Sequence, residues 1–114
     1  MNAIDPEVAS QLAAELPRDV FVSIVQTFEQ DLARLVRQMV DAARADSAEE
    51  YRRAAHALAG AAGSIGARTL ESLARQAMHP ADRTPVQQMI LGIGDAAKAA
   101  LSELSSLAAE PGRR

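Results

Sequence analysis

The sequence predicts an all-α protein, and three observations support this fold class. Hydrophobic residues make up 48% of the 114-residue chain, and they are mostly alanine and leucine, which favour helices over strands. Only Phe21, Phe28 and Tyr51 are aromatic. Apolar residues recur at spacings of three and four, in segments separated by prolines, glycines and short polar stretches. We therefore expect several amphipathic helices joined by short loops.

The first two helices are predicted from their start signals and from the apolar pattern. Asp5 is a typical N-cap, and Pro6 suits the first position of a short helix that extends to about residue 15. Pro17 ends this helix or begins the next one. A long amphipathic helix is predicted from Pro17 to about Arg44, because its apolar residues form one stripe. They are Phe21, Ile24, Val25, Phe28, Leu32, Leu35, Val36, Met39, Val40 and Ala43.

The third and fourth helices follow a polar break at residues 43–47. Ser47 and Glu50 have the spacing of a capping box, so a helix should begin here and continue to Gly66, a plausible stop. A shorter helix is predicted over residues 67–78. It ends before Pro80, because proline disfavours the helical conformation of the residue that precedes it.

The last helix is predicted to begin at the sequence Thr84-Pro85, with Gln87 as the capping partner, and to extend through Leu107. Four substantial amphipathic helices with short loops predict an antiparallel four-helix bundle, with the short N-terminal helix as a lid. We expect one helical domain over residues 1–114, with its core at about residues 3–108 and a frayed tail at 109–114.

Composition excludes several classes of function. The formal charge of −3 and the pI near 5.3 give no basic surface for nucleic acid. No stretch approaches the roughly 20 apolar residues that span a bilayer, and the N-terminus lacks the basic and apolar segments of a signal peptide. The chain has no cysteine, which excludes disulfides, thiol catalysis and thiolate metal sites. We expect a cytoplasmic protein without a membrane partner.

His56 is the most informative residue of the third helix. At 100° per residue, the side chains of its own face fall within about 60° of it. They belong to Arg52, Arg53, Ala59, Gly60 and Gly63. Ala54, Leu58, Ala61 and Ile65 point roughly 140° to 180° away, toward the expected core. The sequence thus predicts an exposed imidazole rather than a core histidine, although an idle, solvated histidine is the simpler alternative.

The two glycines on the face of His56 argue against an idle role. A glycine inside a helix costs about 0.8 to 1 kcal/mol relative to alanine. Gly60 and Gly63 lie opposite the expected core, so we expect no helix of the same bundle to need the space. A surface without side chains beside an exposed imidazole suits the close approach of another protein.

An exposed imidazole can serve such a partner as a nucleophile. Neutral imidazole has an available lone pair near physiological pH. Phosphoryl transfer depends chiefly on alignment and charge compensation, so one nucleophile suffices if the partner supplies a metal and an acidic pocket. Arg52 and Arg53 could attract that pocket or balance the phosphoryl charge. The alternative for each arginine is an ordinary solvated surface residue.

These residues resemble the histidine-containing phosphotransfer (HPt) domains of two-component phosphorelays. The family motif runs histidine, any residue, leucine, lysine and glycine, with a second glycine ten positions after the histidine. Here the residues read His56-Ala57-Leu58-Ala59-Gly60, with Gly66 in the later place, so the histidine, the leucine and both glycines match. The segments IDPEVASQL, FEQDLARLVRQM, RRAAH and IGARTLESLARQAM also resemble the family, so the resemblance covers about residues 3–108.

The resemblance implies a phosphorelay intermediate. His56 would accept a phosphoryl group from a receiver-domain aspartate or a hybrid histidine kinase, and would pass it to the receiver domain of a response regulator. Arg52, Arg53, Ala59, Gly60 and Gly63 would contact the partner. The protein would need no cofactor of its own, with Mg²⁺ expected only in the partner's receiver domain, and would be a monomer. Ala59 departs from the family, because it replaces the lysine that usually stands beside the phosphoryl group.

Three other functional classes are alternatives to a phosphorelay shuttle. Autokinase activity is not expected, because no nucleotide-binding glycine motif is present. A metal site at His79 with Asp82 or Glu71 has weak support, and His79 before Pro80 is better explained as a turn residue. A helical adaptor or dimerisation module that docks signalling proteins without being phosphorylated is the main alternative, and Met39, Met78 and Met89 could contribute to its interface.

Overall fold

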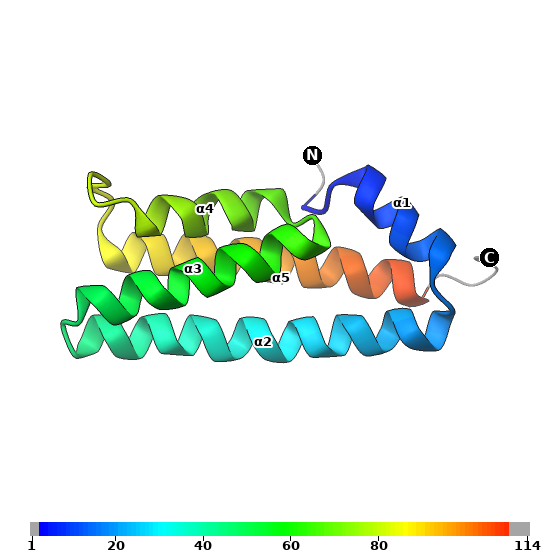
Figure 1. Cartoon of the computed structure of the whole chain (residues 1–114), viewed down its shortest axis with the longest axis horizontal. Coiled ribbons are helices and arrows are strands. Elements are labelled where there is room, and N and C mark those ends of the chain that lie inside the picture. Colours follow the sequence, from blue (N-terminus) through cyan, green and yellow to red (C-terminus); the bar gives the residue numbers. More distant parts are fainter. Residues whose placement is uncertain (1–2, 110–114) are drawn as a thin grey trace.

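The computed structural model describes residues 3–109, which form five α-helices (Figure 1). They are α1 (Pro6–Glu15), α2 (Arg18–Arg44), α3 (Ala48–Ile65), α4 (Arg68–Met78) and α5 (Val86–Ala109). No strand occurs between residues 3 and 109, so the predicted all-α class is confirmed. The predicted frayed tail falls largely on residues 110–114, which lie outside the described residues.

Four of the helices surround one elongated core. Helix α2 packs against α3 and α5, and α4 packs against the same two helices from the other side. The chain reverses direction between α2 and α3, between α3 and α4 and between α4 and α5 (Figure 1). The molecule measures 48 × 23 × 18 Å. Within residues 3–109, no helix combines the length and the apolar character that a membrane span requires.

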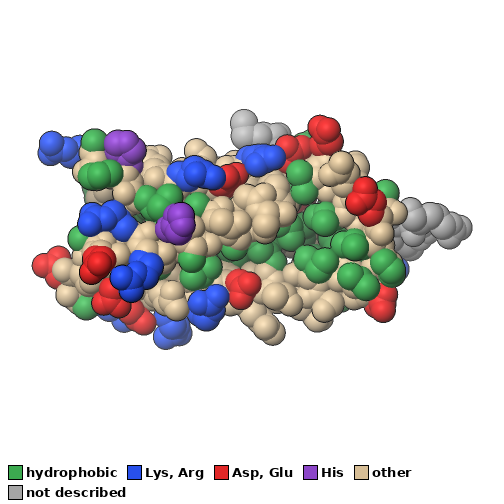
Figure 2. All heavy atoms as spheres, viewed as in Figure 1, with side chains coloured by type: hydrophobic (Ala, Val, Ile, Leu, Met, Phe, Trp, Pro, Cys, Tyr) green, Lys and Arg blue, Asp and Glu red, His purple; other side chains and the backbone are tan. Residues whose placement is uncertain are grey.

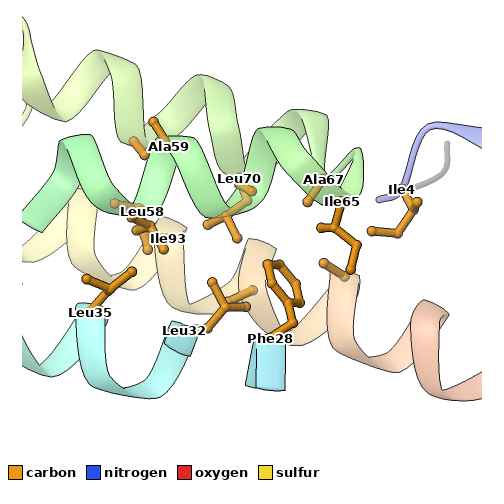
Figure 3. Packing of buried hydrophobic residues seen from close by; sticks show 14 of the residues in the cluster. Ile4, Phe28, Leu32, Leu35, Leu58, Ala59, Ile65, Ala67, Leu70 and Ile93 are labelled. Carbon is orange, nitrogen blue, oxygen red and sulfur yellow. The ribbon is translucent and has the colours of Figure 1, made fainter. Parts of the chain in front are cut away.

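The core takes apolar side chains from every helix. In Figure 3, Leu32 of α2, Leu58 of α3 and Ile93 of α5 point into the space between the helices, and all three are almost fully buried. Burying a side chain of this size stabilises the fold by about 1.5–3 kcal/mol. No polar or charged residue is buried among the described residues. The interior of the bundle is therefore packed with apolar side chains, and the polar side chains lie at its surface.

Helix α1 covers the end of the bundle at which α3 turns into α4. The amide of Asp5 donates a hydrogen bond to the carbonyl of Gly66 at 2.7 Å, and the Asp5 carboxylate pairs with Arg68 at 3.4 Å. The Cβ atom and both methyl groups of Val8 lie against Gly66. These contacts place α1 beside the C-terminal end of α3, away from the middle of that helix (Figure 1).

Most of the predicted helix boundaries are confirmed by the cap geometry. Asp5 accepts a hydrogen bond from the amide of Glu7, and Pro6 is the first residue of α1. The Ser47 hydroxyl accepts from the amide of Glu50 at 3.3 Å, although the amide of Ser47 donates to the carbonyl of Ala42 instead of completing a capping box. Gly66 ends α3 with a φ of 80°, a left-handed conformation that glycine adopts without strain.

The predicted cap at Thr84 is wrong. Helix α5 begins at Val86, one residue after Pro85, and the Thr84 hydroxyl is used elsewhere. It donates to Asp82 Oδ1 and accepts from Gln76 Nε2, each at 3.1 Å. Thr84 therefore fastens the α4–α5 loop to the C-terminal half of α4 instead of capping α5. The glycines at 92 and 94 do not interrupt α5.

Candidate functional site

His56 lies at the centre of α3 with its side chain exposed. Both ends of this helix are capped. Ser47 caps its N-terminus, Glu49 and Glu50 place negative charge in the first turn, and Gly66 closes its C-terminus. Leu58 and the neighbouring alanines anchor α3 on the core, so the backbone that carries the imidazole is fixed. The position outside the core agrees with the prediction from helical geometry.

The buried face of α3 extends further round the helix than the sequence indicated. It comprises Ala54, Ala55, Leu58, Ala59, Ala62 and Ile65. Ala59 is only 3% exposed, so its prediction as a partner-contacting residue is wrong. Helix α4 packs along this flank, and short side chains on α3 allow the two helices to approach closely. In Figure 3, Ala59 lies under α4. A partner therefore cannot reach its side chain.

Gly60 and Gly63 have different surroundings. A Cβ atom added at Gly60 would meet nothing within 4 Å, so the space above this residue is open. A Cβ atom at Gly63 would lie 3.0 Å from Oε2 of Glu71 on α4. The expectation that no helix of the same bundle needs this space is therefore wrong for Gly63. Only Gly60 retains the open surface predicted beside His56.

Arg52 and Arg53 are both exposed on α3, as the helical geometry predicted. Arg53 pairs with Glu49 at 3.6 Å. Both side chains of this pair are strongly solvated, and 74% of the Arg53 side chain is exposed. Such a pair contributes about 1 kcal/mol or less. Arg53 therefore remains available to a partner at little cost.

A second cluster of charges lies on α4, facing α3. Glu71 accepts hydrogen bonds from Arg75 Nη2 at 2.8 Å and from Arg68 Nη1 at 3.2 Å, while its carboxylate rests against Gly63. The hydrogen bonds from Arg75, with a smaller contribution from Arg68, hold the pKa of Glu71 below its ordinary value. Sequence reasoning missed Glu71 and Arg75 as part of this surface. Their spacing of four residues on one helix was the available signal.

Figure 2 shows how these groups are distributed on the face formed by α3 and α4. Histidine atoms are exposed there, and basic side chains gather around them, with basic, acidic and again basic atoms following one another along α4. Hydrophobic atoms lie between them. The surface around the imidazole of α3 is thus more basic than the net charge of −3 suggests.

An open groove of about 590 Å³ runs between α2 and α3 on the other flank of His56. Arg34 and Asp41 of α2 contribute charged groups to it, as do Glu50 and Arg53 of α3, and Ala57 forms part of its floor. His56 therefore stands on a ridge, with α4 on one side and this groove on the other. Nothing on the ridge beside Gly60 obstructs an approaching molecule.

The second histidine has a structural position. His79 follows α4, and its Nδ1 accepts a hydrogen bond from the amide of Ala81 at 3.2 Å, as expected of a turn residue. Asp82 is bound to Gln76 and Thr84, and Glu71 is bound to two arginines. Across residues 3–109, no cluster of three or more histidine and acidic side chains is placed to hold a metal ion. His79 is therefore a turn residue bonded to its own loop, whereas His56 lies in the middle of a helix.

The comparisons with known proteins identify the family. A family model described as the Hpt domain matches residues 23–110, well over half of the chain. The chain belongs to the Hpt domain family. Comparisons with curated proteins and with solved structures give no match. The matched segment contains most of α2 and all of α3, α4 and α5, whereas α1 lies before it.

Membership of this family defines the class of activity. Hpt domains are helical modules for histidine phosphotransfer in two-component phosphorelays. They transfer phosphoryl groups and are not kinases, and they interact with receiver domains of response regulators or kinases. The predicted resemblance is thereby confirmed at the level of the family.

Proposed function

We propose that His56 is the phosphoacceptor of a phosphorelay intermediate. It takes a phosphoryl group from the aspartate of a receiver domain or hybrid kinase and passes it to the receiver domain of a response regulator. The observation that carries this proposal is the exposed imidazole at the centre of a rigid helix, one turn from the open backbone of Gly60. The match to the Hpt domain supports it, because the matched residues include His56.

The chemistry needs only the imidazole from this chain. The lone pair of one ring nitrogen attacks the phosphorus of the aspartyl phosphate, an N–P bond forms, and the bond between phosphorus and the carboxylate oxygen breaks. The electron pair of that bond leaves with the carboxylate, and the other ring nitrogen keeps its proton. Transfer onward reverses these steps. The charge of the moving phosphoryl group is compensated by Mg²⁺ in the receiver domain, so the proposed protein needs no cofactor of its own.

The proposed docking surface is centred on the ridge of α3. Gly60 allows the backbone of the receiver domain to approach, and Arg52 and Arg53 face its acidic pocket. Ala59 is not part of this surface, because it is buried. At Gly63, the Glu71 carboxylate that lies against the glycine forms the surface presented to the partner. In this proposal the chain acts as a cytoplasmic monomer, and the antiparallel four-helix arrangement serves as a rigid support for His56.

The test is a phosphotransfer profile in which the chain is incubated with phosphorylated receiver domains. We expect a label that is stable in base and labile in acid, present in the wild type and absent in His56→Gln. His79→Gln is the matched control, because it removes the only other histidine and should leave labelling unchanged. Circular dichroism should show that both variants keep their helices, because both side chains are exposed.

The same experiment addresses the adaptor alternative. A structural adaptor predicts that no receiver domain labels the chain and that His56→Gln leaves partner binding and cellular output unchanged. Labelling that persists in His56→Gln would also overturn the proposed role of His56.

A further inference from the structure

A phosphoryl group on His56 would be stabilised by a nearby cation of the same chain. It adds a charge of about −1.5 to −2, with oxygens that accept charge-assisted hydrogen bonds. On α3 itself, Arg52 and Arg53 precede His56, and the proposed function assigns both of them to the acidic pocket of the partner. The residues of the helix after His56 are uncharged up to Ile65. A further cation for this site would therefore come from the neighbouring helix α4, which carries Arg68 and Arg75.

One contact shows which residues of α3 and α4 lie at the same level. The Glu71 carboxylate rests against Gly63, and the two helices run in opposite directions from the turn at Gly66. Moving seven residues back from Gly63 to His56 covers about 10 Å along the bundle. Moving four residues forward from Glu71 to Arg75 covers about 6 Å in the same direction. Arg75 thus lies between the levels of Gly63 and His56.

The side chains also share one direction. His56 and Gly63 differ by about 20° around α3, so His56 points to the side of α3 on which Glu71 lies. Arg75 and Glu71 are four residues apart and occupy the same face of α4. The Arg75 side chain is 64% exposed, so most of its surface faces solvent. Figure 2 shows basic atoms and histidine atoms on the same face of the molecule, with hydrophobic atoms between them.

We propose that Arg75 is the charge-compensating residue of this phosphorelay site: it is held by Glu71 when His56 is unmodified and turns to the phosphoryl oxygens when His56 is phosphorylated. This assignment rests on the proposed function of His56. Glu71 then acts as a competitor for Arg75, and its second arginine, Arg68, keeps the carboxylate paired after Arg75 leaves. Gly63 leaves space for the carboxylate that holds Arg75, because a Cβ atom there would lie 3.0 Å from Glu71 Oε2.

The test measures the equilibrium between the phosphorylated receiver domain and phosphorylated His56, using the full chain and one receiver domain that labels it. Arg75→Ala should lower the ratio of phosphohistidine to phosphoreceiver by up to about fivefold, the upper end of the range for an exposed charge pair. Arg75→Lys should restore most of it. Glu71→Gln should raise the ratio above the wild-type value, because it weakens the competing partner.

The opposite signs separate this proposal from a structural role. If the α4 cluster only stabilised the fold, Arg75→Ala and Glu71→Gln would change the ratio in the same direction or leave it unaltered, and either result would overturn the proposal. Arg18→Ala is the matched control, because it removes an exposed arginine at the N-terminal end of α2, and it should leave the ratio near the wild-type value. A loss confined to Arg52→Ala would instead assign the role to α3 and would also overturn the proposal.

The failure of the underlying function is distinguishable. If wild-type His56 takes no label from any receiver domain, both the proposed function and the role of Arg75 are overturned. If His56 is labelled but Arg75→Ala reaches the wild-type ratio, only the role of Arg75 is overturned. The difference between wild type and Arg75→Ala should also shrink in 1 M salt, about the concentration at which the Debye length falls to 3 Å.

Discussion

At the scale of single residues, the small side chains around His56 have two separate roles. Ala59 and Gly63 allow α4 and its Glu71 to approach α3, whereas Gly60 leaves the surface open. The imidazole therefore has one flank built by its own bundle and one side open to a partner. Substitutions at these positions should affect stability and phosphotransfer independently of each other.

Substitutions at Gly60 should separate the effect on stability from the effect on phosphotransfer most clearly. Gly60→Ala should stabilise the protein by about 0.8–1 kcal/mol, because alanine is the better helix former and its Cβ meets nothing. It should transfer phosphate nearly as well as the wild type. Gly60→Gln should also keep or raise stability but should slow transfer strongly, because its side chain occupies the approach to His56. Urea denaturation and transfer rates check both effects, and wild-type transfer by Gly60→Gln would show that docking occurs elsewhere.

Glu71 should make stability depend on pH in the acid range. Its folded-state pKa lies below the ordinary value of 4.5 because of the hydrogen bonds from Arg75 and Arg68. The folded protein therefore releases this proton more readily than the unfolded chain. The resulting stabilisation is complete above pH 4.5 and is lost as the pH falls through the folded pKa. The free energy of unfolding is measured by chemical denaturation between about pH 3 and pH 7, a range that includes the ordinary carboxylate pKa. It should depend less on pH in Glu71→Gln than in the wild type, and identical curves would contradict this expectation.

At the scale of the elements, the turn between α3 and α4 determines where the site lies. Gly66 has a φ of 80°, and it is enclosed by Val8 of α1. The same residue accepts the hydrogen bond from the amide of Asp5. One glycine thus ends α3, sets the direction of α4 and receives α1. The register that brings Glu71 to Gly63 depends on this turn.

Substitution at the turn should therefore be costly. Gly66→Ala should destabilise the protein by at least about 1–2 kcal/mol, the cost of the left-handed conformation for a residue with a Cβ. The clash with Val8 at 2.8 Å adds to this loss. Gly94→Ala in α5 is the matched control, because nothing lies within 4 Å of its Cβ position, and it should stabilise by about 0.8–1 kcal/mol. Thermal unfolding of both variants measures the difference, and equal midpoints would contradict it.

Patterns within single helices predicted the helices well, but they did not predict which residues contact a neighbouring helix or loop. The long stripe of α2 and the caps at Asp5 and Ser47 could be read from residue types, because they depend on local chemistry. The burial of Ala59 could not, because alanine suits a surface as well as an interface and only the position of α4 decides between them. Likewise, the hydroxyl of Thr84 bonds to Asp82 and Gln76 because of how the loop folds back, which a local cap pattern does not contain.

At the scale of the whole molecule, stability and chemistry lie in different places. The described part of the chain buries only apolar residues, and the core receives side chains from all five helices. His56, Gly60 and Arg75 lie outside that core. The bundle should therefore tolerate changes in its phosphotransfer surface without unfolding, and a functional defect at these positions can be attributed to the site.

The central claim is that His56 carries the phosphoryl group, and locating that group tests it most directly. The chain is phosphorylated with a receiver domain, kept in alkaline solution, and cleaved for mass spectrometry of the peptides that contain His56 and His79. The account predicts phosphate on His56 alone. Phosphate on His79 or on any other residue, with His56 unmodified, would contradict it.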